Sequence, residues 1–214
     1  GLERGHHHLP HDKHSDHHEV IFDPGDMRNM GGLRKQMPVT FRVYLIGALA
    51  LAGIFPLAGF WSKDEILADA FHKFPTVYWL LTVAAFLTAF YMGRQVWMVF
   101  YGKPRHAAAG HAEESPKVIT VPLMILAALA ILGGALNLPG VHTLTLWLEH
   151  TIEGVEAGEF NFLVAGLSTG LAVVAIALSW VLYGRKPLVE GQKDPLKKML
   201  GPLFTVFERK YWVD

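Results

Sequence analysis

The sequence contains no cysteine, which excludes disulfide bridges and cysteine-ligated zinc or iron–sulfur centres within these 214 residues. Charge is also scarce: 18% of the residues are charged, whereas a soluble domain normally carries about 25%. The formal net charge is zero, so the chain shows no basic footprint for nucleic acid and we expect no nucleic-acid partner. The sequence also lacks a glycine fingerprint for nucleotides.

Apolar residues make up 51% of the chain and are gathered in long runs. This pattern predicts an all-α integral membrane protein, because a helix needs roughly 20 apolar residues to cross a bilayer. Four transmembrane segments are expected, at 39–74, 75–101, 118–138 and 160–183. The first would be about 54 Å long as one straight helix, so we expect it to be discontinuous.

Charges between the apolar segments predict their orientation. Lys and Arg are frequent in the polar stretch 1–38, the 102–117 loop and the tail 184–214, whereas 139–159 has glutamates and no Lys or Arg. The positive-inside rule therefore puts the first three on the cytoplasmic or matrix side and the acidic 139–159 loop outside. The tail interleaves apolar and basic residues from Leu196. This pattern suits an interfacial amphipathic helix leading towards a lateral helix, or a loop on the inner surface.

Seven of the twelve histidines lie between His6 and His18. Imidazole is a common metal ligand, but these histidines lack a defined ligand spacing and stand in a segment with glycine and proline. We therefore interpret the His-rich stretch as a solvated loop and expect no metal site in this chain.

Three ionisable residues, Lys63, Asp64 and Glu65, directly follow the first apolar run. One interpretation is that the helix ends near Trp61 and that Lys63 extends its ammonium to the outer membrane interface. The other interpretation is that these charges lie within the membrane. Burying a charge at that depth costs free energy, so charged residues found there usually have a function.

The second interpretation rests on an interruption just before the charges. Pro56 lacks a backbone N–H, and Gly53 and Gly59 on either side of it permit irregular backbone. Broken helices of this kind occur in ion-translocating proteins. A partly desolvated Lys63 could release its proton near neutral pH, and Asp64 could accept it. Because neighbouring helical residues point about 100° apart, we expect these two side chains to face different directions.

Arg94 is the one charge embedded in the second apolar segment. An arginine stays charged, so it would act as a fixed charge or as a carboxylate partner rather than as a proton carrier. The alternative is that its guanidinium extends to the inner interface. Three hydroxyl residues of the last segment are interpreted as helix-packing residues: Ser168, Thr169 and Ser179.

The sequence DMRNMGGLRK at 26–35, followed by MPVT at 37–40, resembles the antiporter-like membrane subunits of respiratory complex I. The resemblance continues through 45–54 to GFWSKDEIL at 59–67, and a weaker one covers 75–103. The SKDEIL ending is similar to that of the most distal of these subunits, bacterial subunit L or mitochondrial subunit 5. One departure is the sequence IFPL at 54–57, where many relatives have two consecutive prolines.

The resemblance implies that Lys63 is the lysine on a broken helix of a proton channel, with Asp64 beside it and with Glu65 and Arg94 in support. It implies a C-terminal portion of a longer subunit, whose other channel residues lie upstream. It also implies a bacterial cytoplasmic membrane or a mitochondrial inner membrane as the location. The complex would couple quinone reduction to proton transport, with FMN and iron–sulfur clusters in other subunits and no cofactor here. The expected partners are other membrane-arm subunits, especially the neighbouring antiporter-like subunit, and the lipid bilayer.

Two other functions stay open. Subunits of multisubunit sodium/proton antiporters share the Gly-Gly-Leu-Arg element but usually have Ser-Lys-Glu where this chain has Ser-Lys-Asp-Glu. The chain could also be a non-transporting anchor that stiffens a membrane complex through packing and its tail. Normal transport after neutralisation of Lys63, Asp64 and Arg94 together would favour that third function.

Overall fold

The computed structural model describes residues 23–137, 147, 160–189, 191–209 and 211. All of its regular elements are helices, and the described residues contain no strand. The elements are η1 (Met27–Asn29), α2 (Pro38–Ala52), α3 (Ala58–Lys73), α4 (Pro75–Phe100), α5 (Ala107–Gly110), α6 (Lys117–Leu132), η2 (Gly133–Asn137), α8 (Phe162–Ser179), η3 (Trp180–Gly184), α9 (Pro195–Leu200) and α10 (Pro202–Glu208). The expected all-α fold is therefore confirmed for the part of the chain that the structure describes.

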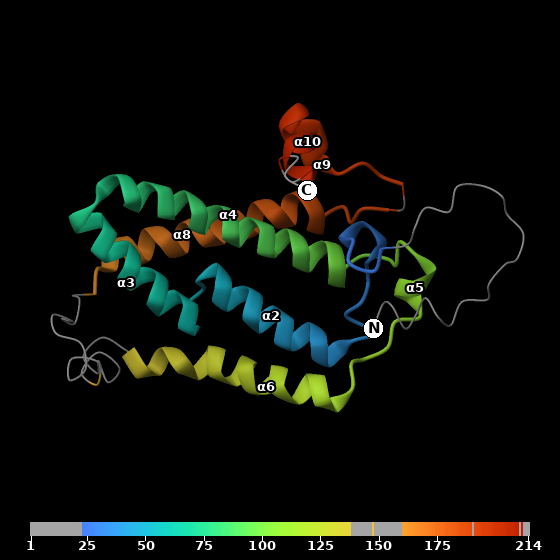
Figure 1. The fold of residues 1–214 in the computed structure, drawn as a ribbon, viewed down its shortest axis with the longest axis horizontal. Coiled ribbons are helices and arrows are strands. Elements are labelled where there is room, and N and C mark those ends of the chain that lie inside the picture. The colour runs from blue at the N-terminus through green and yellow to red at the C-terminus, as the bar shows by residue number, and fades with distance from the viewer. Residues whose placement is uncertain (1–22, 138–146, 148–159, 190, 210, 212–214) are drawn as a thin grey trace, which may run out of the picture.

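The long helices run roughly along one common axis (Figure 1). Helices α2 and α3 follow each other in the same general direction, and α4 returns beside them and packs against both. Helix α6 packs along α2, and α8 packs along α4. The bundle thus consists of the interrupted pair α2 and α3, packed against α4, α6 and α8.

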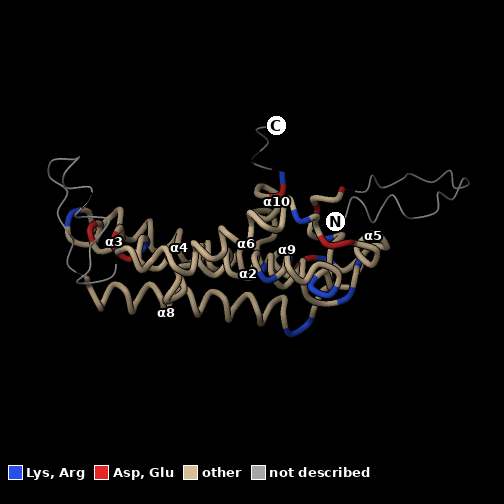
Figure 2. The backbone as a smooth tube through the Cα atoms, turned by 90° about the horizontal axis from the view of Figure 1, so that it is seen from below, with Lys and Arg blue, Asp and Glu red and all other residues tan. Residues whose placement is uncertain are grey.

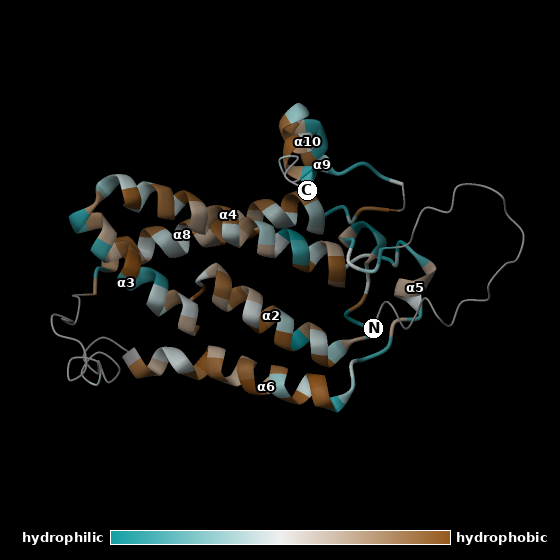
Figure 3. Cartoon of the chain, in the orientation of Figure 1, coloured by the Kyte–Doolittle hydropathy of each residue, from teal (hydrophilic) through white to brown (hydrophobic). Residues whose placement is uncertain are grey.

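Proline and asparagine define where several helices begin. Pro38 and Pro75 occupy the first turns of α2 and α4, where a missing backbone N–H costs little. Asn161 caps α8 by accepting hydrogen bonds from the backbone N–H groups of Leu163 and Val164. These local signals fix the starts of helices whose remaining residues are mostly apolar, with scattered polar ones (Figure 3).

Three described helices are long and apolar enough to cross a membrane: Pro75–Phe100, Lys117–Leu136 and Phe162–Gly184. Many of their large apolar side chains are exposed, for example Leu80, Leu126 and Phe162. That arrangement suits a lipid environment rather than water. The apolar helix α2 is shorter, at 15 residues, so length and composition alone do not establish the four expected crossings.

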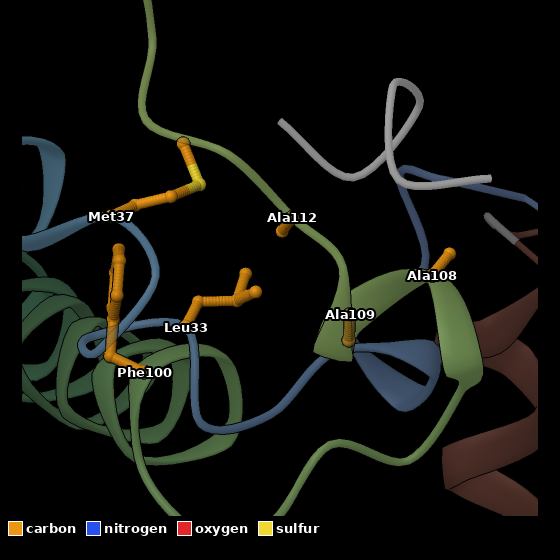
Figure 4. Packing of buried hydrophobic residues seen from close by; sticks show 6 residues of the cluster. All are labelled: Leu33, Met37, Phe100, Ala108, Ala109 and Ala112. Carbon is orange, nitrogen blue, oxygen red and sulfur yellow. The ribbon is translucent and has the colours of Figure 1, made fainter. Parts of the chain in front are cut away.

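One end of the bundle holds a compact apolar core around Leu33 (Figure 4). Leu33 lies between Phe100 on α4 and Ala109 on α5, and Met37 at the start of α2 belongs to the same cluster. Most Lys and Arg residues of the described part gather at this end (Figure 2). The 28–42 region, the 102–117 loop and the tail therefore share one end, and the side of the membrane that it faces stays a prediction.

The tail forms two short helices, α9 and α10, rather than one continuous helix. The interruption falls at Gly201, whose φ of 53° is in the left-handed region, and at Pro202, which begins α10. Apolar side chains such as Met199, Leu203 and Phe207 are exposed beside the basic residues. The basic residues of this helical pair, Lys197 and Lys198, both lie on α9, and the interfacial position of the tail stays a prediction.

Candidate functional site

The first apolar segment breaks between Ala52 and Ala58. Gly53 ends α2 in a left-handed conformation with φ of 79°, and its backbone N–H bonds to the carbonyls of Ala50 and Leu49. The N–H of Ile54 also bonds to the Leu49 carbonyl, at 3.1 Å. A residue with a Cβ is strained at this φ, so glycine suits the position where α2 stops.

The second glycine at the break allows the two helices to approach closely. A Cβ added at Gly59 would collide with the backbone carbonyl of Ala50 in α2. Between the glycines, Pro56 follows a cis peptide bond, and the Pro56 carbonyl accepts a hydrogen bond from the indole of Trp61. The three residues that the sequence singles out, Gly53, Pro56 and Gly59, therefore all lie at the point where the helix is interrupted.

Lys63 extends from the second turn of α3 back to the end of α2. Its Nζ donates a hydrogen bond to the carbonyl oxygen of Leu51, at 2.5 Å. This carbonyl belongs to the last turn of α2, where helical carbonyls lack an intrahelical partner and carry partial negative charge. The ammonium of Lys63 thus serves as a charged cap on the end of the broken helix.

Asp64 lies on a different face of α3 from Lys63. Its side chain is only 2% exposed, and its Oδ1 has no hydrogen-bond partner within the described structure. Leu67 and Ala68, one turn further along, are also buried, so this face of α3 packs into the bundle. Glu65, the third residue of the charged cluster, is exposed. The structure therefore brings Lys63 to the break and Asp64 into the protein interior.

Arg94 forms a second buried polar cluster, near the other end of α4. Its Nη2 lies 2.5 Å from Oδ2 of Asp194, and its guanidinium stacks on the ring of Tyr183 at 5.3 Å. The Tyr183 hydroxyl donates to Oδ1 of the same carboxylate at 2.6 Å. Arg94 therefore has a carboxylate partner, and it is separate from the Lys63 site.

The Asp194 carboxylate also caps α9 through the backbone N–H of Leu196, at 2.9 Å. Burial opposes its ionisation, but the hydrogen bonds from Tyr183 and Arg94 outweigh burial and hold the pKa of Asp194 below its usual range. One ionised carboxylate thereby connects α4, η3 and the tail. The sequence does not indicate Asp194 as the partner of Arg94, because the two are 100 residues apart and Asp194 stands in a polar stretch without a motif.

Two further polar residues, missed by the sequence reasoning, hold the loops at this end of the bundle. Glu114 accepts hydrogen bonds from the Val39 N–H at 2.6 Å and from the Thr40 hydroxyl at 2.6 Å, and so caps α2. Arg105 is 6% exposed and donates to four backbone carbonyls: those of Met27, Arg28, Met98 and Leu188. Both residues connect segments that are distant in sequence.

Two sequence-based predictions fall on residues outside the described part: the His-rich stretch at 6–18 and the acidic loop at 139–159. Within the described residues, no group of three His, Asp or Glu side chains is placed to hold a metal ion. The packing interpretation of Ser179 agrees with its geometry, since a Cβ at Gly93 on α4 would collide with the Ser179 hydroxyl.

Residues 17–88 match a family described as NADH:quinone oxidoreductase/Mrp antiporter, transmembrane. The chain is 39% identical to NAD(P)H-quinone oxidoreductase chain 5 of Picosynechococcus over 184 residues, 74% of this chain and 28% of the relative. It is 34% identical to chloroplastic subunit 5 of Mesostigma viride, over 91% of this chain and 31% of the relative. NADH-quinone oxidoreductase subunit L of Mycobacterium tuberculosis is 36% identical over 79% of this chain and 28% of the relative.

The chain therefore spans a little under a third of the length of these relatives. The matched family region contains α2, the break and α3, so the Lys63 site lies inside it. Residues 17–88 of this membrane protein therefore match the transmembrane region that NADH:quinone oxidoreductases and Mrp antiporters share, and most of the chain is similar to the subunits called subunit L or chain 5.

Proposed function

We propose that this chain provides a lysine-bearing section of a proton path in a membrane-arm subunit of an NADH:quinone oxidoreductase. The observation that carries the proposal is the position of Lys63. Its ammonium lies on the Leu51 carbonyl at a helix break, and the next residue, Asp64, is a buried carboxylic acid with an unpartnered oxygen. Buried ionisable groups at a helix interruption are a typical construction of ion-translocating membrane proteins.

In this proposal, α2 and α3 together form one discontinuous membrane crossing, in addition to α4, α6 and α8. Helix α2 has 15 residues and α3 has 16, so each is about 22–24 Å long. The apolar core of a bilayer is about 30 Å thick, so neither helix crosses it alone. The break between them would then lie within the membrane, covered by α4, α6 and α8.

The proposed step is a simple proton transfer. The Lys63 ammonium releases one proton to a water molecule or a carboxylate on its outward side and becomes a neutral amine. A proton arriving from the rest of the path restores the ammonium. Asp64 is the acceptor that we propose on this chain, because it is adjacent in sequence and its carboxyl group is buried in the bundle, on the neighbouring face of α3. Glu65 adds a charge on the exposed side of α3, and Arg94 is a fixed charge in its own cluster with Asp194; neither carries the transferred proton.

The remaining parts of the reaction belong to other subunits in this proposal. Electron transfer with FMN and iron–sulfur clusters would take place there, and this chain would bind neither the electron donor nor quinone. Its partners would be the other membrane-arm subunits, especially the neighbouring antiporter-like subunit, and the surrounding lipid. The tail helices α9 and α10 would lie at the inner interface of the membrane.

The proposal is tested by Lys63→Ala in the full-length subunit, purified within its complex and reconstituted in liposomes. Proton pumping should fall well below that of the wild type, measured per electron transferred. Gly47→Ala is a matched control, because a Cβ at Gly47 meets open space. Normal pumping by Lys63→Ala, at a normal electron-transfer rate, would contradict the proposal.

A second candidate is a subunit of a multisubunit sodium/proton antiporter, which the family description also includes. The same Lys63 site would then exchange protons against sodium without electron transfer. Deletion of the gene separates the two functions. Loss of salt or alkali tolerance with NADH oxidation intact would favour the antiporter, whereas impaired NADH-driven pumping would favour the oxidoreductase.

A further inference from the structure

The side chain of Lys63 passes directly over Gly53 on its way to the end of α2. A Cβ built on Gly53 would lie 3.1 Å from Cδ of Lys63 and 3.9 Å from its Nζ. The ammonium then bonds to the Leu51 carbonyl at 2.5 Å. Gly53 therefore meets two requirements at once: a positive φ that ends α2, and free space for the lysine stem.

We infer that Gly53 is a positioning residue for Lys63, and that the Lys63 charge in turn closes the last turn of α2. Gain or loss of the lysine proton would then change the order of the broken helix itself. This inference rests on the proposed function of Lys63 as a proton carrier, and it adds a structural consequence to each transfer.

The physical reason is the electrostatics of a helix C-terminus. The carbonyls of Leu49 to Ala52 have no following helical N–H groups, apart from the bonds that Gly53 and Ile54 donate to Ala50 and Leu49. An ammonium on the Leu51 carbonyl forms a charge-assisted hydrogen bond and lies at the negative end of the helix dipole. A neutral amine keeps only the weaker hydrogen bond, so the last turn is held less firmly.

Few other charges in the bundle could replace this interaction. Helix α8 and η2, which pack against α3, contain no charged residue. Of the other helices that contact α3, α4 has only Arg94, which is paired with Asp194. The charges of α2 and α6 are Arg42, in the second turn of α2, and Lys117, the first residue of α6. The other nearby acids are Asp64 and Glu65 on α3 itself. The end of α2 therefore depends on Lys63 for a positive charge within the described bundle.

Gly59 fixes the distance over which Lys63 must extend. Because a side chain at Gly59 would collide with the Ala50 carbonyl, the second residue of α3 lies directly against the last turn of α2. Lys63 stands four residues further along, on the same face of α3. This spacing places the lysine stem over Gly53 and its ammonium at Leu51.

The experiment measures amide hydrogen exchange of the segment 49–57 in the full-length subunit within its membrane assembly. Lys63→Met has a similar stem without the charge, and we expect it to speed exchange at Gly53 and Ile54 by roughly five- to thirtyfold. Lys63→Arg retains the charge, so amide exchange at Gly53 and Ile54 in this variant should be close to the wild-type rate. Arginine does not release its proton, so the same variant should lose proton pumping.

Gly53→Ala tests the positioning role, with Gly47→Ala inside α2 as the control. We expect faster exchange at 49–57 for Gly53→Ala, since the Cβ displaces the lysine stem, and no change for Gly47→Ala. The positive φ adds a strain that is independent of Lys63, so the double variant Gly53→Ala/Lys63→Met separates the two effects. Amide exchange at 49–57 in the double variant should be slower than the rate expected if the effects of the two single substitutions were independent.

The outcomes separate this inference from the proposed function. Wild-type exchange in Lys63→Met would overturn the inference, whatever the pumping rate. Strict additivity in the double variant would show that Gly53 acts only through its own backbone, and would overturn its positioning role. Normal pumping in Lys63→Arg would instead contradict the proton-carrier function, while the exchange results would still decide whether Lys63 caps α2.

Discussion

The guanidinium of Arg94 on α4 forms an ion pair at 2.5 Å with the carboxylate of Asp194, the residue that caps α9. Both side chains are largely buried, at 20% and 8% exposed. Breaking a buried ion pair leaves an uncompensated charge, which costs far more than breaking an exposed pair. The pair therefore determines how firmly the tail is attached to the helix bundle.

We expect Asp194→Asn to destabilise the attached tail by about 3–5 kcal/mol, because the Arg94 charge stays buried without a carboxylate. Trypsin cleavage at Lys197 and Lys198 in the purified membrane protein measures the effect. Glu208→Gln is the matched control: it removes exposed ion pairs with Arg28 and Lys197, each worth about 1 kcal/mol or less. Equal cleavage rates in the two variants would contradict this prediction.

The cap that Glu114 provides for α2 should weaken in acid. Burial opposes ionisation of Glu114, but hydrogen bonds from Thr40, Val39 and Ser115 outweigh it and lower its pKa. A lowered folded-state pKa contributes stability above the unfolded value of about 4.3, and this stability is lost as the pH falls through the folded pKa. Hydrogen exchange at Thr40 and Phe41 should therefore accelerate below about pH 4.

Glu114→Gln should remove most of this pH dependence and raise exchange at neutral pH. Glu113→Gln is the control, because the neighbouring Glu113 is exposed. If exchange in Glu114→Gln accelerates in acid by the same amount, a group other than Glu114 controls the stability of the start of α2.

Packing of α4 on α8 should depend on the absence of a side chain at Gly93. A Cβ there would collide with the hydroxyl of Ser179, so we expect Gly93→Ala to destabilise the protein by about 1–3 kcal/mol in thermal unfolding. Adding Ser179→Ala removes the colliding oxygen and should recover part of the loss. Gly166→Ala on α8 meets open space and should be neutral or slightly stabilising.

Arg105 should tolerate no neutral substitution. Its guanidinium donates to four backbone carbonyls that belong to η1, α4 and the start of the tail. Arg105→Met leaves buried carbonyls without a donor, at about 1–3 kcal/mol for each one that water does not reach. We expect Arg105→Lys to recover only part of the stability, because an ammonium cannot form the same planar set of bonds. Full recovery by lysine, in the same thermal unfolding assay, would contradict the geometric argument.

Local signals predicted the interruption correctly. Gly53, Pro56 and Gly59 interrupt an apolar run, and the backbone properties of glycine and proline follow directly from the sequence. In the structure the helix ends at Ala52 and a new helix begins at Ala58. The 3.6-residue period also indicated that Lys63 and Asp64 would point in different directions. Their proposed roles in proton transfer stay predictions.

The contacts that sequence reasoning missed are all distant along the chain. Glu114 caps a helix that begins 76 positions earlier, at Pro38, and Asp194 pairs across 100 residues. Nothing local marks either residue as a partner, since each stands in a short polar connection. The interruption of the tail is different, because Gly201 and Pro202 are ordinary signals of a helix end and could have been recognised.

The unequal polarity of α2 and α3 has a consequence for how the chain enters a membrane. Helix α2 has no charged residue after Arg42, whereas α3 has five charged residues, Lys63, Asp64, Glu65, Asp69 and Lys73. A charged residue at the centre of an isolated helix costs about 2.5–3.5 kcal/mol on insertion, so α3 is a poor membrane segment by itself. It becomes acceptable once α4 and α8 cover its Asp64 face and α2 supplies a carbonyl for Lys63. In the proposed membrane arrangement, insertion of α3 would therefore depend on α4 and α8, which are synthesised after it, and its final depth would be set during assembly rather than at the translocon.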